Sequence, residues 1–333
     1  MTDAPAVAAM PITTDGPAAD DHHVRAVIIE GIARLMDADV PSPAPDAEIL
    51  LTHVLDVDRA QLTRMRILGH MVPDIAYRDF WHLIAQRAAR IPLQHLTGQA
   101  PFRNLTLAVG PGVFIPRPET EEVAQAAIDE ARRITSEGRS GKATPVVVDL
   151  CTGSAAIALA VATEVPESQV YAVELDAAAH AWAHRNVTQA GAENLTLIKA
   201  DARTALQDLN GQADIVVSNP PYIPPNATPR DPEVADHDPA VALYGLGVDG
   251  LEVPRGIAAA AARLLKPGGL FIMEHAEVQA AAARTMLETI VDATHANMTG
   301  AHATATTSAF TNIATRNDLT GRPRMVTARR MEH

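Results

Sequence analysis

Cysteine is almost absent from this chain: Cys151 is the single cysteine in 333 residues. One cysteine excludes an internal disulfide, fits a reducing compartment and leaves no thiol cluster for zinc. The 13 histidines show no ligand spacing beside carboxylates, and we interpret His22 and His23 as solvated side chains in a polar tail. We therefore expect no metal cofactor.

Long apolar runs are also missing. No stretch approaches the roughly 18 apolar residues in a row that mark a membrane-spanning helix. Residues 1–22 contain neither Lys nor Arg and no apolar segment of the kind found in signal peptides. Their richness in Ala, Pro, Thr and Asp predicts a disordered tail. We expect a cytoplasmic protein without a membrane partner.

Positive charge is in deficit. The chain has 27 Lys and Arg against 40 Asp and Glu, a formal net charge of −13. Such a surface repels phosphate backbones over most of its area, although it leaves room for a local basic groove. No stable binding of nucleic acid is expected.

What the chain does contain is an ordinary globular composition, 47% hydrophobic and 20% charged, at a length that suffices for two domains. Residues 23–100 predict a helical substrate-docking domain. Apolar residues recur there at helical spacing, as in Val24, Ile28, Ile32 and Leu35. Residues 101–117 predict a β-hairpin linker, with strands at Leu105–Val109 and Val113–Ile115 around a Gly/Pro turn.

Residues 118–333 alternate predicted strands with predicted helices and would form the catalytic domain. The first strand, Val146–Val148, is wholly apolar, as is typical of a parallel strand covered on both faces. Further strands are predicted at Val170–Glu174, Leu195–Lys199, Ala213–Ser218, Leu270–Glu274, Phe310–Ala314 and Met325–Ala328. Repeated β-α units of this kind predict an α/β fold with a doubly wound, Rossmann-like sheet.

A candidate cofactor loop, Asp149–Ala155, follows the first strand, at the edge where open α/β sheets bind ligands. Gly153 permits close approach of the backbone, and a helix that begins near Ser154 would point N–H groups at a ligand. Glu174 ends the next strand, where an acid can pair with both hydroxyls of a ribose; taken alone, Glu174 or Asp201 also fits a solvated strand end. Because this loop has one glycine where a dinucleotide fingerprint needs three, we favour S-adenosylmethionine over a nicotinamide cofactor.

The most informative motif is Asn219-Pro220-Pro221-Tyr222, directly after an apolar strand. A planar amide or amine nitrogen is a poor nucleophile because its lone pair is delocalised, so an enzyme must hold it. The Asn219 side-chain oxygen and the Pro220 carbonyl can accept its two N–H groups and turn the lone pair toward a methyl donor. The prolines stiffen the loop and Tyr222 offers a stacking face. Taken alone, the four residues also fit a Pro-rich turn that closes a strand.

Both loops lie at the carboxyl edge of one predicted sheet, so the ligand loop and the acceptor loop should face each other. Proximity and orientation can then carry methyl transfer without a metal and without a strongly shifted base. We predict Asn219 and Pro220 as the catalytic residues and nominate no general base.

From the helical region to near its end, the chain resembles the release-factor glutamine methyltransferase family, known as PrmC or HemK. The segment Gly112–Glu121 is more specific to that family than any general methyltransferase motif. The other segments that carry the resemblance are Arg90–Gly98, Asp149–Ser154, Asn219–Ile223, Glu233-Val234, Asp238-Pro239, Asp249–Leu251, Glu274-His275 and Asp318–Arg322.

The resemblance implies a seven-stranded class I methyltransferase domain behind the helical domain. It further implies N5-methylation, from S-adenosylmethionine, of the glutamine in the Gly-Gly-Gln motif of class 1 peptide chain release factors. By position, the methionine and ribose part of the cofactor would contact Cys151, Thr152, Gly153, Ser154 and Ala155, with Glu174 on the ribose hydroxyls. Asp201 and Ala202 would lie on the adenine side, and Asn219, Pro220, Pro221 and Tyr222 would hold the substrate glutamine, with Asn219 also near the cofactor.

Departures from the family pattern concern three small residues. Relatives often have Gly at the positions of Cys151 and Ala155, so we expect a bulkier loop and a cofactor seat narrowed by the Ala155 methyl group. Ala202 stands where relatives often have an aromatic residue, which removes an adenine stack at that position.

Three rival interpretations remain open. A glutamine methyltransferase that acts on a ribosomal protein would share the tetrapeptide and the fold. An adenine-N6 methyltransferase of DNA or RNA is disfavoured by the acidic balance and by the lack of a basic, aromatic-rich arm. A catalytically silent, cofactor-binding partner of the translation machinery is disfavoured by the intact tetrapeptide.

Overall fold

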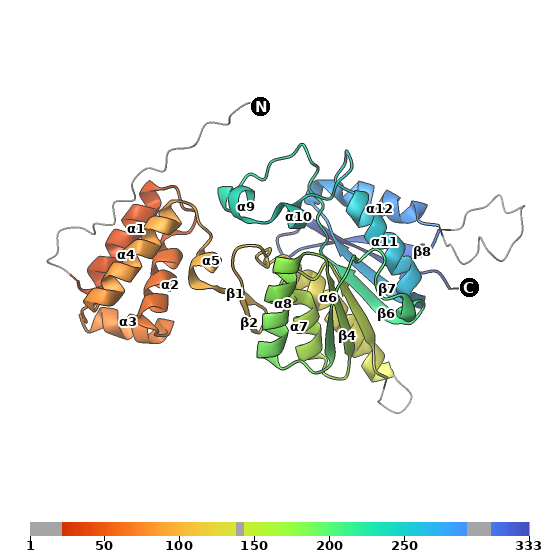
Figure 1. Ribbon diagram of the computed structural model, residues 1–333, viewed down its shortest axis with the longest axis horizontal. Coiled ribbons are helices and arrows are strands. Elements are labelled where there is room, and N and C mark those ends of the chain that lie inside the picture. Colours follow the sequence, from red (N-terminus) through yellow and green to blue (C-terminus); the bar gives the residue numbers. More distant parts are fainter. Residues whose placement is uncertain (1–21, 138–142, 292–307, 333) are drawn as a thin grey trace, which may run out of the picture. The chain divides into compact units, whose positions relative to one another are not determined.

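The computed structural model of the protein describes residues 22–137, 143–291 and 308–332 (Figure 1). The chain divides into two compact units, Met1–Gly98 and Gln99–His333. Each unit has its own hydrophobic core. Of the predicted tail, every residue except His22 lies outside the described residues.

The first unit is helical, as predicted. Its core includes Leu35, Leu50, Phe80 and Ile84. Gly31 leaves room for the Phe80 ring between two helices, since a Cβ at Gly31 would lie 2.7 Å from Phe80 Cζ. The helices are α1 (Val24–Asp37), α2 (Pro43–Leu55), α3 (Arg59–Ile67), α4 (Asp74–Ala88) and α5 (Leu93–Thr97).

The prediction that His22 and His23 lie in a polar tail is wrong, because both residues are tied to this unit, although the His23 side chain is exposed as predicted. The His22 ring stacks on Tyr77, with 4.0 Å between the ring centroids, and His22 Nδ1 lies 3.5 Å from the Asp74 carboxylate. His23 Nδ1 is 2.9 Å from the backbone oxygen of Gly69. These partners come from the segment around the start of α4, which sequence spacing does not connect to the two histidines.

The second unit begins with a hairpin whose strands differ from those predicted. β1 (Gln99–Phe102) pairs antiparallel with β2 (Leu105–Ala108), and Val113–Ile115 forms no strand. The turn therefore precedes Leu105 rather than following it. Gly110, which follows β2, is needed for close packing and not for a turn between strands. A Cβ at Gly110 would lie 2.6 Å from the Trp182 ring.

A seven-stranded sheet forms the centre of this unit, in the order β5-β4-β3-β6-β7-β9-β8. The strands from β5 to β7 are parallel, and β9 runs antiparallel to both β7 and β8. This arrangement confirms the predicted Rossmann-like fold. The strands are β3 (Val146–Leu150), β4 (Gln169–Glu174), β5 (Leu195–Lys199), β6 (Ala213–Ser218), β7 (Leu265–Glu274), β8 (Phe310–Asn317) and β9 (Pro323–Arg330).

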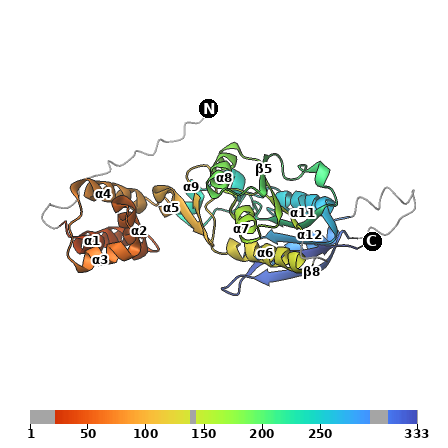
Figure 2. The same ribbon diagram turned by 90° about the horizontal axis from the view of Figure 1, so that it is seen from below.

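Helices cover both faces of the sheet (Figures 1 and 2). One core cluster joins the sheet to α6 (Thr120–Glu137), α7 (Ala156–Glu164) and α8 (Ala177–Ala190). A second cluster, on the opposite face, joins it to α11 (Glu252–Leu264) and α12 (Ala280–Thr289). Short elements complete the unit: η1 (Gln207–Leu209), α9 (Pro232–His237), α10 (Ala240–Leu243) and η2 (Glu277–Gln279).

β7 begins earlier than predicted, although Pro267–Gly269 is typical of a turn. Leu265 pairs with Ala213, whereas Leu270 pairs with Ile215. Four residues of β7 thus stand opposite one residue of β6. The segment Pro267–Gly269 therefore lies in a bulge inside β7 and not in a turn before the strand.

The strand register brings the two predicted loops together. Leu150 on β3 pairs with Ser218 on β6 and with Val173 on β4. The residues that follow these three are therefore at the same level of the sheet; they are Cys151, Glu174 and Asn219. The strand order reverses between β3 and β6, which is where doubly wound folds form a ligand crevice.

Candidate active site

A cavity of about 650 Å³ opens at this carboxyl edge of the sheet, within the usual size range of small-molecule sites. Most of the predicted site residues line it: Cys151, Thr152, Gly153, Ser154, Glu174, Asp201, Ala202, Asn219, Pro221 and Tyr222. Ala155 and Pro220 are buried and are not among the lining side chains. The expectation that the Ala155 methyl group narrows the cavity is therefore wrong, because that methyl packs into the core below α7.

The loop after β3 is held by a buried carboxylate. Asp149 Oδ2 accepts hydrogen bonds from the Thr152 hydroxyl at 2.6 Å and from the Ala158 backbone N–H at 3.1 Å. Burial raises the pKa of Asp149 to about 7. Cys151 and Ala155 adopt left-handed backbone conformations, with φ of 62° and 66°, which cost a non-glycine residue about 1–2 kcal/mol each. The glycines that relatives often carry would relieve this strain.

Glu174 faces the same loop from the end of β4 and is 8% exposed. Its Oε2 accepts a hydrogen bond from the Gly153 N–H and its Oε1 accepts one from the Asp176 N–H, both at 2.8 Å. Burial raises the pKa of Glu174. Because a carboxylate offers about four acceptor positions on its two oxygens, Glu174 can still accept hydroxyl groups from a bound ligand.

The loop after β5 contains an ion pair that the sequence did not single out. Arg203 donates to both oxygens of Asp201, with its shortest bond of 2.6 Å between Nη2 and Oδ2. This hydrogen bonding lowers the pKa of Asp201. Gly256 gives the arginine room, since a Cβ there would lie 2.7 Å from Arg203 Cδ. Arg203 lines the cavity beside Ala202, at the position where no aromatic side chain is present.

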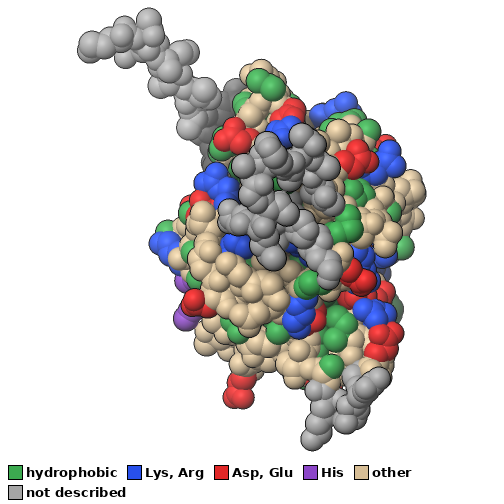
Figure 3. Space-filling model, turned by 90° about the vertical axis from the view of Figure 1, so that its right-hand side faces the viewer, with side chains coloured by type: hydrophobic (Ala, Val, Ile, Leu, Met, Phe, Trp, Pro, Cys, Tyr) green, Lys and Arg blue, Asp and Glu red, His purple; other side chains and the backbone are tan. Residues whose placement is uncertain are grey.

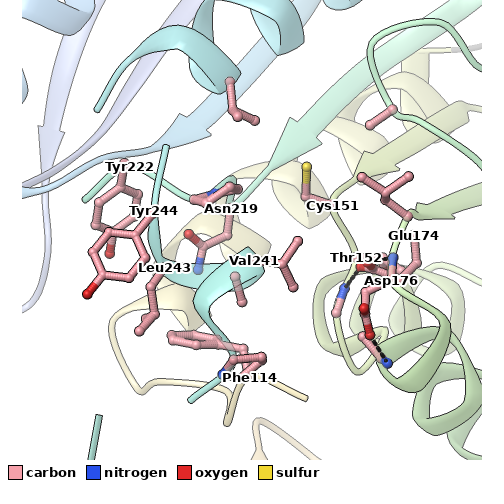
Figure 4. A pocket seen from close by; sticks show the side chains of 18 of the residues that line it. Phe114, Cys151, Thr152, Glu174, Asp176, Asn219, Tyr222, Val241, Leu243 and Tyr244 are labelled. Atoms are coloured by element: carbon pink, nitrogen blue, oxygen red, sulfur yellow. Dashed lines mark hydrogen bonds between the residues drawn. The ribbon is translucent and has the colours of Figure 1, made fainter. Parts of the chain in front are cut away.

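The tetrapeptide loop forms the opposite wall. Figure 4 shows Asn219 and Tyr222 on one side of the cavity, Glu174 and Thr152 on the other, and Cys151 between them. Asn219 Nδ2 donates to the hydroxyl of Thr120 at 3.3 Å. The Asn219 side chain is thus attached to the first residue of α6.

A second buried carboxylate stands behind this wall. Glu274, at the end of β7, is 2% exposed. It accepts hydrogen bonds from the hydroxyls of Thr120 at 2.8 Å and of Tyr222 at 3.3 Å. Burial raises the pKa of Glu274 to about 7, and burial beside Glu274 also raises the pKa of Tyr222. From sequence, Glu274 is an acid that ends an apolar strand and belongs to one of the segments of the family resemblance, but neither feature indicates its hydrogen bonds to Thr120 and Tyr222.

A third wall, which the sequence did not predict, is largely apolar and includes Phe114, Leu243 and the rest of α10. Arg117 donates to Asp238 at 2.6 Å and its guanidinium lies 4.9 Å from the centroid of the Phe114 ring. The Ile223 N–H donates to the Leu243 carbonyl at 2.8 Å. These contacts join the tetrapeptide loop, α10 and the segment before α6 around one cavity.

Two further observations bear on the class of site. Within the described residues, no group of three or more His, Cys, Asp and Glu side chains is arranged to hold a metal ion. None of the helices in the described ranges combines the length and the apolar character that crossing a bilayer requires.

Two family models match the chain. Residues 26–98 match the PrmC N-terminal domain, and residues 120–231 match the methyltransferase small domain. Together with the seven-stranded sheet and the cavity at its switch point, the second match defines the class: this is an S-adenosylmethionine-dependent methyltransferase of the Rossmann-like type.

Curated relatives give the family. A release factor glutamine methyltransferase from Streptomyces coelicolor is 48% identical over 256 residues, which cover 76% of this chain and 85% of the relative. One from Mycolicibacterium smegmatis is 44% identical over 310 residues, 92% of this chain and 98% of the relative. The chain belongs to the release factor glutamine methyltransferase family. A 4-amino-L-phenylalanine/4-methylamino-L-phenylalanine methyltransferase from Streptomyces pristinaespiralis is also similar, 37% identical over 76% of this chain and 82% of that relative.

Proposed function

We propose that this protein transfers a methyl group from S-adenosylmethionine to the side-chain amide nitrogen, N5, of the glutamine in the Gly-Gly-Gln motif of class 1 peptide chain release factors. Relatives that match nearly the full length carry the name of that activity. The observation that carries the proposal is the position of Asn219 and Glu174 on opposite sides of a single cavity.

The chemistry of the cofactor wall fits S-adenosylmethionine. Glu174 is a buried carboxylate with free lone pairs, which suits the two hydroxyls of a ribose. A Cβ at Gly153 would meet nothing within 4 Å, so the loop beside Glu174 is open toward the cavity. Cys151, Thr152 and Ser154 would lie along the methionine and ribose part, and Asp201 and Ala202 would lie along the adenine.

When bound, S-adenosylmethionine supplies a methyl group on a positively charged sulfur; the acceptor nitrogen forms the new N–CH₃ bond while the S–CH₃ electron pair stays on sulfur, leaving S-adenosylhomocysteine. The protein's part is to hold the nitrogen. The Asn219 side-chain oxygen and the Pro220 carbonyl would each accept one N–H, so that the lone pair points at the methyl group. Tyr222 and Pro221 would pack against the flat amide. One N–H proton then leaves to water.

The charge pattern supports a protein acceptor over a nucleic acid. On the face that Figure 3 shows, Lys and Arg side chains are interspersed with Asp and Glu among the coloured residues. The formal net charge is −13. A mixed, acidic surface suits contact with a folded protein better than contact with a phosphate backbone.

The test is a transfer assay with a methyl-labelled cofactor. The acceptors are a class 1 release factor, the same factor with the motif glutamine replaced by alanine, a ribosomal protein, duplex DNA and 4-amino-L-phenylalanine. The proposal predicts label on the intact release factor and none on its alanine variant. Label that appears instead on DNA, on the ribosomal protein or on the free amino acid contradicts the proposal, and so does a protein that labels nothing.

A further inference from the structure

The position of Glu274 suggests a role in methyl transfer, although Glu274 does not line the cavity. The parallel pairing of β6 with β7 ends with Ser218 opposite Met273. The next residues of the two strands, Asn219 and Glu274, therefore lie at the same level of the sheet. Thr120, which begins α6 and is 4% exposed, stands between their side chains.

The hydrogen bonds through Thr120 have a defined direction. A threonine hydroxyl has one proton, and Thr120 gives it to Glu274 Oε2 at 2.8 Å. The Thr120 oxygen can then only accept, so the Asn219 side chain must turn its NH₂ toward Thr120, as the 3.3 Å bond from Nδ2 shows. The carboxamide oxygen is left at the other end of the group.

We propose that ionised Glu274, acting through Thr120, fixes the orientation of the Asn219 carboxamide so that its oxygen is the end available to the substrate nitrogen. Glu274 and Thr120 are positioning residues in this account, and the inference rests on the proposed function of Asn219. A reversed carboxamide would present NH₂ to the substrate NH₂, two donors with no acceptor between them.

The relay depends on the charge of Glu274. A protonated Glu274 can donate to Thr120, which frees the Thr120 proton for the Asn219 oxygen and removes the preference for one orientation. Burial raises the pKa of Glu274 most, and the hydrogen bond from Thr120 lowers it. The other groups that face Glu274 are Arg324 on β9 and Tyr222 after β6, which lower its pKa, and Glu119 before α6, which raises it. With burial as the largest cause, the pKa of Glu274 lies at about 7. The relay is thus complete above neutral pH and lost below it.

Steady-state kinetics test the relay. Thr120→Val keeps the shape of the side chain but neither donates nor accepts. We expect turnover to fall about 10- to 100-fold, less than the roughly 100- to 1,000-fold cost of losing a preorganised group itself, because Thr120 acts only through Asn219. Cofactor affinity should stay within about three-fold, because Thr120 acts on the acceptor side. Thr120→Ser restores the hydroxyl and should recover most of the turnover. Thr327→Val, an equally buried threonine on β9, is the matched control and should have little effect.

The pH profile of turnover distinguishes a positioning role of Glu274 from a purely structural one. Turnover of the wild type should rise as the pH passes through about 7, the value for Glu274. Glu274→Gln cannot titrate and should lose this step, whereas Glu130→Gln, which changes a buried glutamate outside the cavity, should keep it. A Thr120→Val enzyme with normal turnover and an unchanged pH step would overturn the proposal.

A spectroscopic readout separates the relay from the proposed function. In ¹⁵N-labelled protein, the side-chain NH₂ signal of Asn219 is identified by its disappearance in Asn219→Asp. Its shift should follow the titration of Glu274 in the wild type and in Thr120→Ser, and not in Thr120→Val. If the signal responds in this way but no release factor is methylated, the relay stands and the proposed function falls. If methylation occurs and the signal does not respond, the relay is wrong.

Discussion

The two walls of the cavity are both organised by a buried carboxylate, but they use different donors. On the cofactor side, Glu174 accepts from the backbone N–H groups of Gly153 and Asp176. On the acceptor side, Glu274 accepts from the hydroxyls of Thr120 and Tyr222. A backbone N–H can only donate, whereas a hydroxyl can reverse its direction. The contacts of Glu174 should therefore keep their direction at any pH at which the fold persists, whereas those of Glu274 can reverse.

The largest expected effect separates the two walls at Asn219. Asn219→Ala removes the side-chain acceptor and should lower turnover about 100- to 1,000-fold, as for the loss of one preorganised group in other active sites. Cofactor affinity, measured by calorimetry, should change by no more than a few-fold. Asn194→Ala removes bonds to the backbone oxygens of Ala162 and Ser168, away from the cavity, and should leave turnover intact. Near-normal turnover in Asn219→Ala would contradict the acceptor role.

The complementary change is on the cofactor wall. Glu174→Gln keeps one acceptor oxygen but places an NH₂ group against a backbone N–H, and it weakens the contact with the ribose hydroxyls. We expect cofactor affinity to fall about 10-fold or more, on the scale of one hydrogen bond to a charged group, with a smaller change in turnover at saturating cofactor. Glu164→Gln, which loses an ion pair with Arg103 outside the cavity, is the control. Equal loss of affinity in both variants would show that Glu174 has no special contact.

The pH dependence of stability sharpens the contrast. Burial raises the pKa of Glu274 from an ordinary value of 4.5 to about 7, so the folded state binds its proton more tightly than the unfolded chain. Its contribution to stability is therefore present below pH 4.5 and is lost as the pH rises through about 7. Glu274→Gln should reduce the fall of the unfolding free energy in this window by up to about 1.4 kcal/mol per pH unit. Denaturant unfolding at several pH values measures this pH dependence. Identical slopes of the unfolding free energy against pH in the wild type and in Glu274→Gln would contradict a raised pKa for Glu274.

The smallest expected effect concerns backbone strain on the cofactor wall. Cys151→Gly relieves a left-handed φ of 62° and should stabilise the fold by at most about 0.5–1 kcal/mol, the strain relief less the entropy cost of a glycine, because the half-buried thiol also loses its packing against the core. Ala155→Gly relieves similar strain but also removes a fully buried methyl, worth about 0.8 kcal/mol, so its net effect should be near zero. Thermal unfolding of the pair distinguishes them. Destabilisation by Cys151→Gly would show that the thiol packs better than its position suggests.

Much of this fold was predictable from local pattern. β5 and β6 have the predicted bounds, because apolar and β-branched residues predominate in both segments. The local pattern predicts the wrong hairpin strands because Gly110 and Gly112 are typical of a turn, whereas Gly110 gives room to Trp182 from α8. Packing against a distant helix is not legible in a local pattern.

The candidate site divides in the same way. Asn219, Glu174 and Gly153 were predictable because each stands directly after a recognisable strand or inside a short motif. Thr120 and Arg203 were not, because their roles depend on partners in three dimensions: Thr120 meets Glu274 across 154 positions of the chain, and Arg203 packs against Gly256.

Mass spectrometry of a class 1 release factor incubated with this protein and S-adenosylmethionine tests the central claim most directly. The account predicts that the peptide with the Gly-Gly-Gln motif gains one methyl group on the glutamine side chain, and that the protein with Asn219→Ala adds almost none. A wild-type reaction that leaves this glutamine unmodified, or methylates another residue in its place, contradicts the account.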